Sequence, residues 1–141
     1  MTATIPSLAE AAERTLPAYL GRQLIAEFYD CPVHLLNDKD FIERAMNDAA
    51  RDCGATIVNS VFHLFNPHGV SGAVIIAESH LTIHTWPEHG YAAVDVFTCG
   101  ETVDPSDAVD SLSRALQAGH TSASEMNRGH TRTITRQVGA H

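Results

Sequence analysis

The sequence predicts an α+β fold in which an antiparallel β-sheet is covered on one face by two helices. The first observation is a series of β-branched, apolar segments linked by short turns that contain proline or glycine. The second is a pair of segments inserted into that series, in which apolar residues recur every three or four positions. Turn-linked strands pair antiparallel, and two helices on one face complete a sandwich of two layers.

Length and composition indicate a single domain with one site. The chain has 141 residues, of which 44% are hydrophobic, and a chain of this length buries one modest core. Its net charge of −8 argues against a nucleic-acid partner, because such partners need a basic face. The same charge slightly favours a cationic substrate.

The cysteines and the apolar segments predict a cytoplasmic protein without a membrane partner. Cys31, Cys53 and Cys99 include no C-x-x-C pair and cannot all form disulfides, which fits a reducing compartment. The segment before Leu16 carries acidic residues and lacks a long apolar run, so a secretory signal is not expected there. No stretch approaches the ~20 apolar residues needed to cross a bilayer.

Residues 1–19 are expected to be an extension outside the domain. Within them, Ser7 can cap a short amphipathic helix that ends near Leu16. Residues 21–29 form the first predicted strand. This strand ends before Pro32, because proline lacks the N–H that a central strand requires.

A long helix is predicted next. Asn37 or Asp38 can cap its start, and Gly54 ends it. Apolar residues between these points recur at helical spacing, which indicates a face directed to the core. The residues of this face are Phe41, Ile42, Ala45, Met46, Ala49, Ala50 and Cys53.

Three more strands are predicted after this helix. Residues 55–65 form the second strand, and a turn at 67–69 reverses it into the apolar run 70–77. The segment that follows is expected as a third strand that breaks at Ser79 and resumes. A fourth strand then covers residues 91–99.

Asp104 can cap a second helix that ends near Gly119. The chain beyond this helix is polar and is expected to turn at 128–129. Residues 131–141 are expected to be a loose tail, so the predicted domain spans residues 20–130.

The stretch 78–88, Glu-Ser-His-Leu-Thr-Ile-His-Thr-Trp-Pro-Glu, places a hydroxyl, two imidazoles and carboxylates in an apolar, β-rich part of the chain. A serine hydroxyl can attack the carbonyl that precedes it, and removal of the serine α-proton then cuts the chain and leaves, after loss of ammonia, a pyruvoyl group. In a regular strand His80 and His84 share one face and Ser79 points to the other. Alternation alone therefore does not bring His84 to Ser79, and a kink of the strand at the cut site is expected.

This stretch, followed by Phe97-Thr98-Cys99-Gly100, resembles the small prokaryotic S-adenosylmethionine decarboxylase proenzymes. The resemblance continues upstream without gaps through Gly69-Val70-Ser71-Gly72 and Gly54-Ala55-Thr56 as far as Gly21-Arg22. It implies the same α+β fold and a small-molecule substrate of the amino-acid type.

The resemblance implies self-cleavage between Glu78 and Ser79, with a covalent pyruvoyl group made from Ser79 as the cofactor and no metal. His84 matches the base that drives processing, and Ser71 matches a hydroxyl that helps the ester to form. Cys99 matches the residue that donates a proton after carbon dioxide has left, a task for which a protonated thiol is suited.

The resemblance also implies how the substrate binds. Phe65 matches the residue that stacks on adenine, Glu88 matches the one that binds the ribose hydroxyls, and His63 has a supporting role. The implied activity converts S-adenosylmethionine to the aminopropyl donor for spermidine synthesis. The implied assembly is a dimer of processed protomers with sites at or near the interface.

Two other functions remain open from the sequence. A pyruvoyl decarboxylase of arginine or ornithine needs no adenine site, and several residues near Phe65 or in the first strand depart from those common in the family. These departures are Leu64, Asn66, His68 and Gln23. A metalloenzyme needs several imidazoles, although no cysteine pair or carboxylate cluster accompanies them here. The available imidazoles are His63, His80, His84 and His89.

Overall fold

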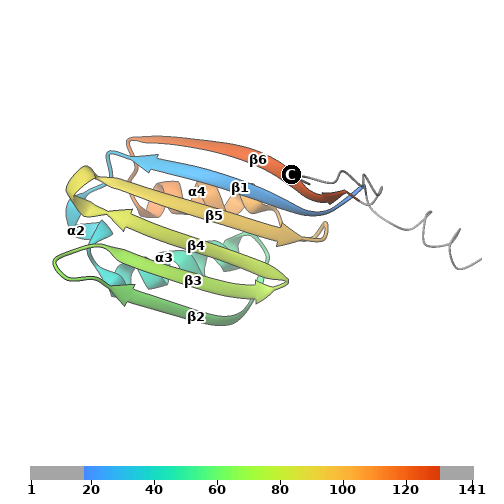
Figure 1. Cartoon of the computed structure of the whole chain (residues 1–141), viewed down its shortest axis with the longest axis horizontal. Coiled ribbons are helices and arrows are strands. Elements are labelled where there is room, and N and C mark those ends of the chain that lie inside the picture. Colours follow the sequence, from blue (N-terminus) through green and yellow to red (C-terminus); the bar gives the residue numbers. More distant parts are fainter. Residues whose placement is uncertain (1–17, 131–141) are drawn as a thin grey trace, which may run out of the picture.

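The computed structural model describes residues 18–130. They form one six-stranded antiparallel sheet in the order β2-β3-β4-β5-β1-β6, with the helices on one face (Figure 1), so the predicted α+β sandwich is confirmed. The elements are β1 (Tyr19–Tyr29), α2 (Val33–Leu36), α3 (Lys39–Asp52), β2 (Thr56–Leu64), β3 (Val70–Ala77), β4 (Ser79–Trp86), the 3-10 turn η1 (Pro87–His89), β5 (Tyr91–Cys99), α4 (Pro105–Ala115) and β6 (His120–His130). The helix expected over residues 7–16 and the tail 131–141 lie outside the described residues.

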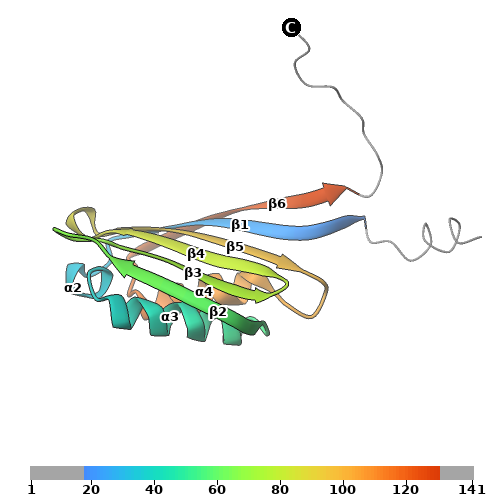
Figure 2. The same ribbon diagram turned by 60° about the horizontal axis from the view of Figure 1, so that its bottom comes forward.

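The core lies between the sheet and helices α3 and α4 (Figure 2). Alternation along the strands selects the inner face: Leu81 and Ile83 of β4 are fully buried, and Thr82 between them points away from the helices. Each fully buried aliphatic side chain stabilises the fold by about 1.5–3 kcal/mol. Helix α3 supplies the predicted apolar face, whose buried residues are Ile42, Ala45, Met46, Ala49 and Ala50.

Two aspartates fix the starts of the long helices. The side chain of Asp38 accepts a hydrogen bond from the N–H of Phe41 at 3.0 Å, and that of Asp104 accepts one from the N–H of Ser106 at 3.0 Å. Asp38 is therefore the cap of α3, and Asn37 has another task. Its Oδ1 accepts a hydrogen bond from the N–H of Gly69 at 2.9 Å, which ties the β2–β3 turn to the start of the helix.

The break expected at Ser79 is a complete reversal of the chain. Strands β3 and β4 pair antiparallel, and their register begins with Ile76 opposite Ser79. Only Ala77 and Glu78 lie between these two partners, so the hairpin is tight. The sequence at this turn contains no proline, glycine, asparagine or aspartate, the residues that usually indicate a turn, and this is why a reversal was not expected.

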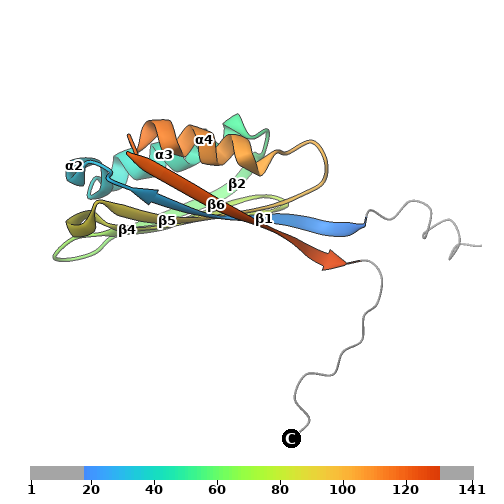
Figure 3. The same ribbon diagram turned by 90° about the horizontal axis from the view of Figure 1, so that it is seen from above.

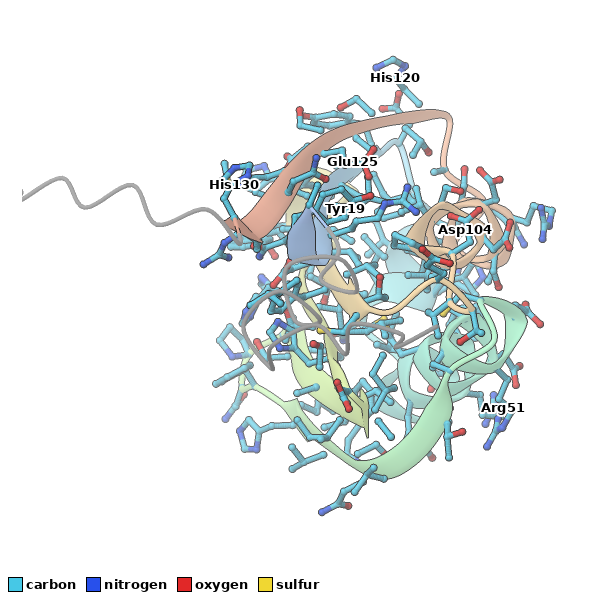
Figure 4. The ribbon with its side chains drawn as sticks, turned by 90° about the vertical axis from the view of Figure 1, so that its right-hand side faces the viewer. Tyr19, Arg51, Asp104, His120, Glu125 and His130 are labelled. Atoms are coloured by element: carbon cyan, nitrogen blue, oxygen red, sulfur yellow. The ribbon has the colours of Figure 1, made fainter. Side chains whose placement is uncertain are left out.

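Residues 120–130 form a sixth strand where the sequence predicted only a turn at 128–129. Strand β6 pairs with β1 at the edge of the sheet, and Figure 4 shows its ends, His120 and His130. Almost all of its residues are exposed, so the strand lacks the apolar alternation that makes a half-buried strand recognisable. Backbone pairing with β1 and side-chain contacts hold it instead, including an ion pair of 2.6 Å between Arg22 Nε and Glu125 Oε1.

The face of the sheet opposite the helices stays uncovered within residues 18–130 (Figure 3). Large apolar side chains lie on this open face with 41–67% of their area exposed. They are Ile25, Val61, Ile75, Trp86 and Met126. A patch of this kind is typical of a surface that another molecule covers. Separately, no helix of the described part of the chain is long and apolar enough to cross a membrane.

Candidate active site

Ser79 and Cys99 meet at one end of the sheet. Ser79 begins β4, Cys99 ends β5, and Ser79 Oγ lies 3.2 Å from Cys99 Sγ. A regular strand would turn Ser79 to the inner face with Leu81. Its backbone φ of 113° departs from strand geometry, and its hydroxyl reaches the sulfur of a residue on the open face. Such a φ is sparsely populated for a residue with a Cβ and costs on the order of 1–3 kcal/mol.

Ser71 and His84 form a second pair on the open face. They are direct partners in the β3–β4 register, and Ser71 Oγ lies 2.7 Å from His84 Nδ1. The pair lines a depression together with Val61, His63 and Thr82. An imidazole that is hydrogen-bonded through one nitrogen can accept or donate a proton through the other.

The two pairs lie far apart within one chain. His84 is five residues beyond Ser79 along β4, a separation of about 16 Å at the usual rise of a strand. Because β3 and β4 run antiparallel, Ser71 also lies at the far end from the hairpin. The positive φ at Ser79 supplies a kink, but it directs the hydroxyl to Cys99 and leaves His84 with Ser71.

The residues expected to bind the substrate lie at the same end as His84. Phe65 follows β2, is 47% exposed, and meets the His63 ring edge to face at a centroid distance of 4.5 Å. Glu88 lies in η1, directly after β4, and its Oε2 is 2.5 Å from Nε2 of His68 in the β2–β3 turn. Phe65 and Glu88 thus flank the Ser71–His84 pair and are distant from the Ser79–Cys99 pair.

The environments of the three cysteines differ. Burial raises the pKa of the Cys31 thiol to about 11, with a further contribution from Asp30, and burial also raises the pKa of Cys53. Both thiols are buried, so they stay protonated and unreactive. Cys99 is only half-buried and lies beside Ser79. It is therefore the cysteine in a position to meet a substrate.

A further group of side chains lies next to Ser79 and was not expected from the sequence. His80 Nε2 is 3.0 Å from Asp95 Oδ2, and Gln23 Nε2 donates to Asp95 Oδ1 at 2.7 Å. Arg128 in turn donates to Gln23 Oε1. The available signal was Asp95 itself, a carboxylate within an apolar strand, but its partners come from strands distant in sequence.

Three of the imidazoles each contact one polar side chain. His80 pairs with Asp95, His84 with Ser71, and His68 with Glu88. Residues 18–130 contain no group of three or more histidine, cysteine, aspartate or glutamate side chains arranged to hold a metal ion. The open-face histidines are thus engaged in pairwise contacts.

Comparison with known proteins identifies the family. A family model described as S-adenosylmethionine decarboxylase matches residues 22–129. The S-adenosylmethionine decarboxylase proenzyme of Acidithiobacillus ferrooxidans is 58% identical over 110 residues, which cover 78% of this chain and 83% of that protein. The proenzyme of the same name from Thermotoga petrophila is 57% identical over 110 residues, covering 78% of this chain and 85% of that protein.

A solved structure agrees with this result. The crystal structure of the adenosylmethionine decarboxylase from Aquifex aeolicus matches with a TM-score of 0.77 and 31% identity, over 86% of this chain and 100% of that chain. The sequence match and the structural match both span most of the residues that form the sheet and its helices. The chain belongs to the S-adenosylmethionine decarboxylase family.

Proposed function

We propose that the chain is a self-processing, pyruvoyl-dependent decarboxylase that converts S-adenosylmethionine to decarboxylated S-adenosylmethionine, the aminopropyl donor for spermidine synthesis. The observation that carries the proposal is the 3.2 Å contact between Ser79 Oγ and Cys99 Sγ at the β3–β4 reversal. The relatives support it, because they are named as proenzymes of S-adenosylmethionine decarboxylase.

Self-cleavage begins with attack of Ser79 Oγ on the carbonyl carbon of Glu78, which replaces the amide by an ester. A base then removes the α-proton of residue 79, and the Cβ–O bond breaks with release of the Glu78 carboxylate. Water replaces the nitrogen of the resulting dehydroalanine, and ammonia leaves. The strained backbone at Ser79 favours the first step, because the ester relieves a conformation that the chain holds at a cost.

The processed site uses several side chains of the same family pattern. The pyruvoyl group, when present, withdraws electrons from the substrate as carbon dioxide leaves. The Cys99 thiol holds a proton beside residue 79, where it can return that proton to the substrate carbon. Phe65 offers an exposed ring for adenine, and the Glu88 carboxylate offers two oxygens for the ribose hydroxyls.

Two copies of the chain complete the site in this proposal. Ser79 and Cys99 lie at one end of the open face, whereas Ser71, His84 and the substrate-binding residues lie at the other. A second copy packed on the open face in the opposite direction brings its own His84 end to the Ser79 end of the first. The exposed apolar side chains of that face support such an interface. The free thiols support the expected cytoplasmic location.

The substrate is tested by carbon dioxide release from S-adenosylmethionine, arginine and ornithine, assayed side by side. We expect kcat/KM for S-adenosylmethionine to exceed both others by on the order of a hundredfold or more, because Phe65 and Glu88 serve groups that arginine and ornithine lack. A higher kcat/KM for arginine or ornithine would show that the departures at Leu64, Asn66 and His68 decide the substrate.

The role of Cys99 is tested by Cys99→Ala. The variant is expected to cleave itself but to turn over about 10²–10⁴-fold more slowly, the usual contribution of a positioned proton donor. Misdirected protonation should also convert residue 79 to alanine in proportion to turnovers completed, which mass spectrometry of the 79–141 chain measures. Cys53→Ala, which removes a buried thiol of the core, is the control. It should keep the wild-type partitioning, that is, the fraction of turnovers that leave alanine at residue 79. If Cys99→Ala matches wild type in rate and in inactivation, the proton has another source.

A further inference from the structure

A closed ring of side chains lies on the open face directly beside Ser79. His80 meets one oxygen of Asp95 at 3.0 Å, and Gln23 donates to the other oxygen at 2.7 Å. Arg128 donates to Gln23 and also lies over the ring of Phe97, 5.6 Å from its centroid. Phe97 completes the ring through an edge-to-face contact with His80 at 5.8 Å and 68°. Four strands, β4, β5, β1 and β6, contribute to this cluster.

The cluster joins the start of β4 to the part of β5 that carries Cys99. His80 is the residue after Ser79, and its Cα partner on β5 is Phe97. Asp95, Phe97 and Cys99 alternate along β5, so they share the open face. The contact of His80 with Asp95 therefore fixes the two strands relative to each other one residue after Ser79 on β4 and four residues before Cys99 on β5.

Gln23 and Arg128 determine which atom of Asp95 faces His80. Gln23 occupies Oδ1 as a donor, which leaves Oδ2 as the acceptor that His80 meets. The amide of Gln23 is itself oriented, because its oxygen accepts from Arg128. The carboxylate thus has both oxygens engaged, and Gln23 holds one of them independently of His80.

Self-cleavage makes this anchorage more important. In the uncut chain, the bond to Glu78 and pairing with Ile76 and Thr98 hold Ser79 in place. Cleavage removes the covalent bond, and residue 79 becomes the end of a chain, where order is commonly lost unless side chains tie the segment down. His80 is the first side chain after the cut, and its bond to Asp95 is the first such tie.

We propose that His80 is a positioning residue that, held by Asp95, keeps residue 79 facing the Cys99 thiol after the chain is cut. The inference rests on the proposed self-cleavage and adds to it a role for the His80–Asp95 contact. This role requires the hydrogen bond between His80 and Asp95, and an aromatic ring at position 80 is not sufficient for it. A displacement of about 1 Å at a reacting centre can cost on the order of a hundredfold in rate, so a loose chain end is expected to be costly.

Two substitutions at position 80 separate the hydrogen bond from the ring. His80→Phe keeps an aromatic ring against Phe97 and removes the bond, whereas His80→Gln loses the ring and supplies an amide donor for Asp95. We expect His80→Phe to lower kcat by about tenfold to a hundredfold, with KM within about twofold of wild type, and to raise the fraction of turnovers that leave alanine at position 79. His80→Gln should recover most of the rate and of the partitioning.

Asp95→Asn gives a second route to the same result, because an amide offers one acceptor oxygen to the two donors that now share a carboxylate. Its kcat should fall as in His80→Phe. The matched control is Glu125→Gln, which breaks another β1–β6 side-chain contact, the Arg22–Glu125 ion pair, away from this cluster. The control should keep wild-type kcat and partitioning.

Intact mass spectrometry of the wild type and all variants is recorded beside the kinetics and the melting temperatures. An uncut wild-type chain would overturn the proposed function and this inference with it. A cut, active wild type with His80→Phe and Asp95→Asn equal to it in kcat and partitioning would overturn the positioning role alone. Equal losses in His80→Phe and His80→Gln at unchanged melting temperature would likewise exclude the hydrogen bond as the cause.

Discussion

A Ser79→Ala chain is expected to remain whole and without decarboxylase activity, while the wild type separates into residues 1–78 and 79–141. The methyl group of alanine cannot attack the carbonyl of Glu78, so neither the ester nor the pyruvoyl group forms. Loss of the cofactor removes the chemistry entirely, and activity should fall below detection. Intact mass spectrometry after long incubation measures the cleavage, and carbon dioxide release measures the activity.

Ser124→Ala is the matched control for this substitution. Ser124 lies on β6, is exposed, and has Ile25 as its Cα partner, away from the Ser79–Cys99 contact. The control chain should be cut at the wild-type rate and be fully active. Cleavage or turnover by Ser79→Ala, or a wild-type chain that never cuts, would contradict self-processing at Ser79.

Co-expression of two inactive variants, Ser79→Ala and His84→Ala, is expected to restore cleavage and activity. Alone, His84→Ala should process about 10²–10⁴-fold more slowly than wild type, because it lacks the base. In a mixed dimer, the intact Ser79 of one chain meets the intact His84 of the other if the site is shared. The cut chain is the His84→Ala chain, and the mass of its 79–141 fragment identifies it.

Ser71→Ala co-expressed with His84→Ala is the control for this experiment. Both substitutions lie in the same hydrogen-bonded pair. In a mixed dimer each chain therefore carries a pair with one altered member, so neither Ser79 faces a pair in which Ser71 and His84 are both intact. Cleavage and activity of this combination should not exceed the sum of the values for the two variants expressed alone. Failure of Ser79→Ala and His84→Ala to complement, with both chains sedimenting together as dimers, would place the whole site in one chain. Sedimentation of the wild type as a monomer would contradict the shared site directly.

Local patterns in the sequence were sufficient for most of the elements. Apolar residues at helical spacing and the caps Asp38 and Asp104 predicted both long helices, because these signals arise within a few residues of each other. The strands that face the core on one side, β1, β3 and β5, show enough apolar character to be recognised. The motif around Ser79 and the Phe-Thr-Cys-Gly segment predicted the family, since the match is long and gapless.

The elements that the sequence did not predict are those that depend on contacts with residues distant in the chain. Strand β6 carries polar residues at the edge of the sheet, and pairing with β1, about a hundred positions away, is what makes it a strand. The reversal at Ala77 and Glu78 contains no proline, glycine, asparagine or aspartate and depends on the antiparallel register of β3 with β4.

The arrangement of the site depended on folding in the same way. Alternation along β4 placed Ser79 and His84 on opposite faces of one strand, but it left the partner of each side chain undetermined. The cross-strand register supplies these partners: Ser71 for His84 and Cys99 for Ser79. It also brings Asp95, Gln23 and Arg128 to His80 from three other strands. A sequence pattern specifies the face on which a side chain lies, whereas contacts between strands distant in sequence exist only once the sheet has formed.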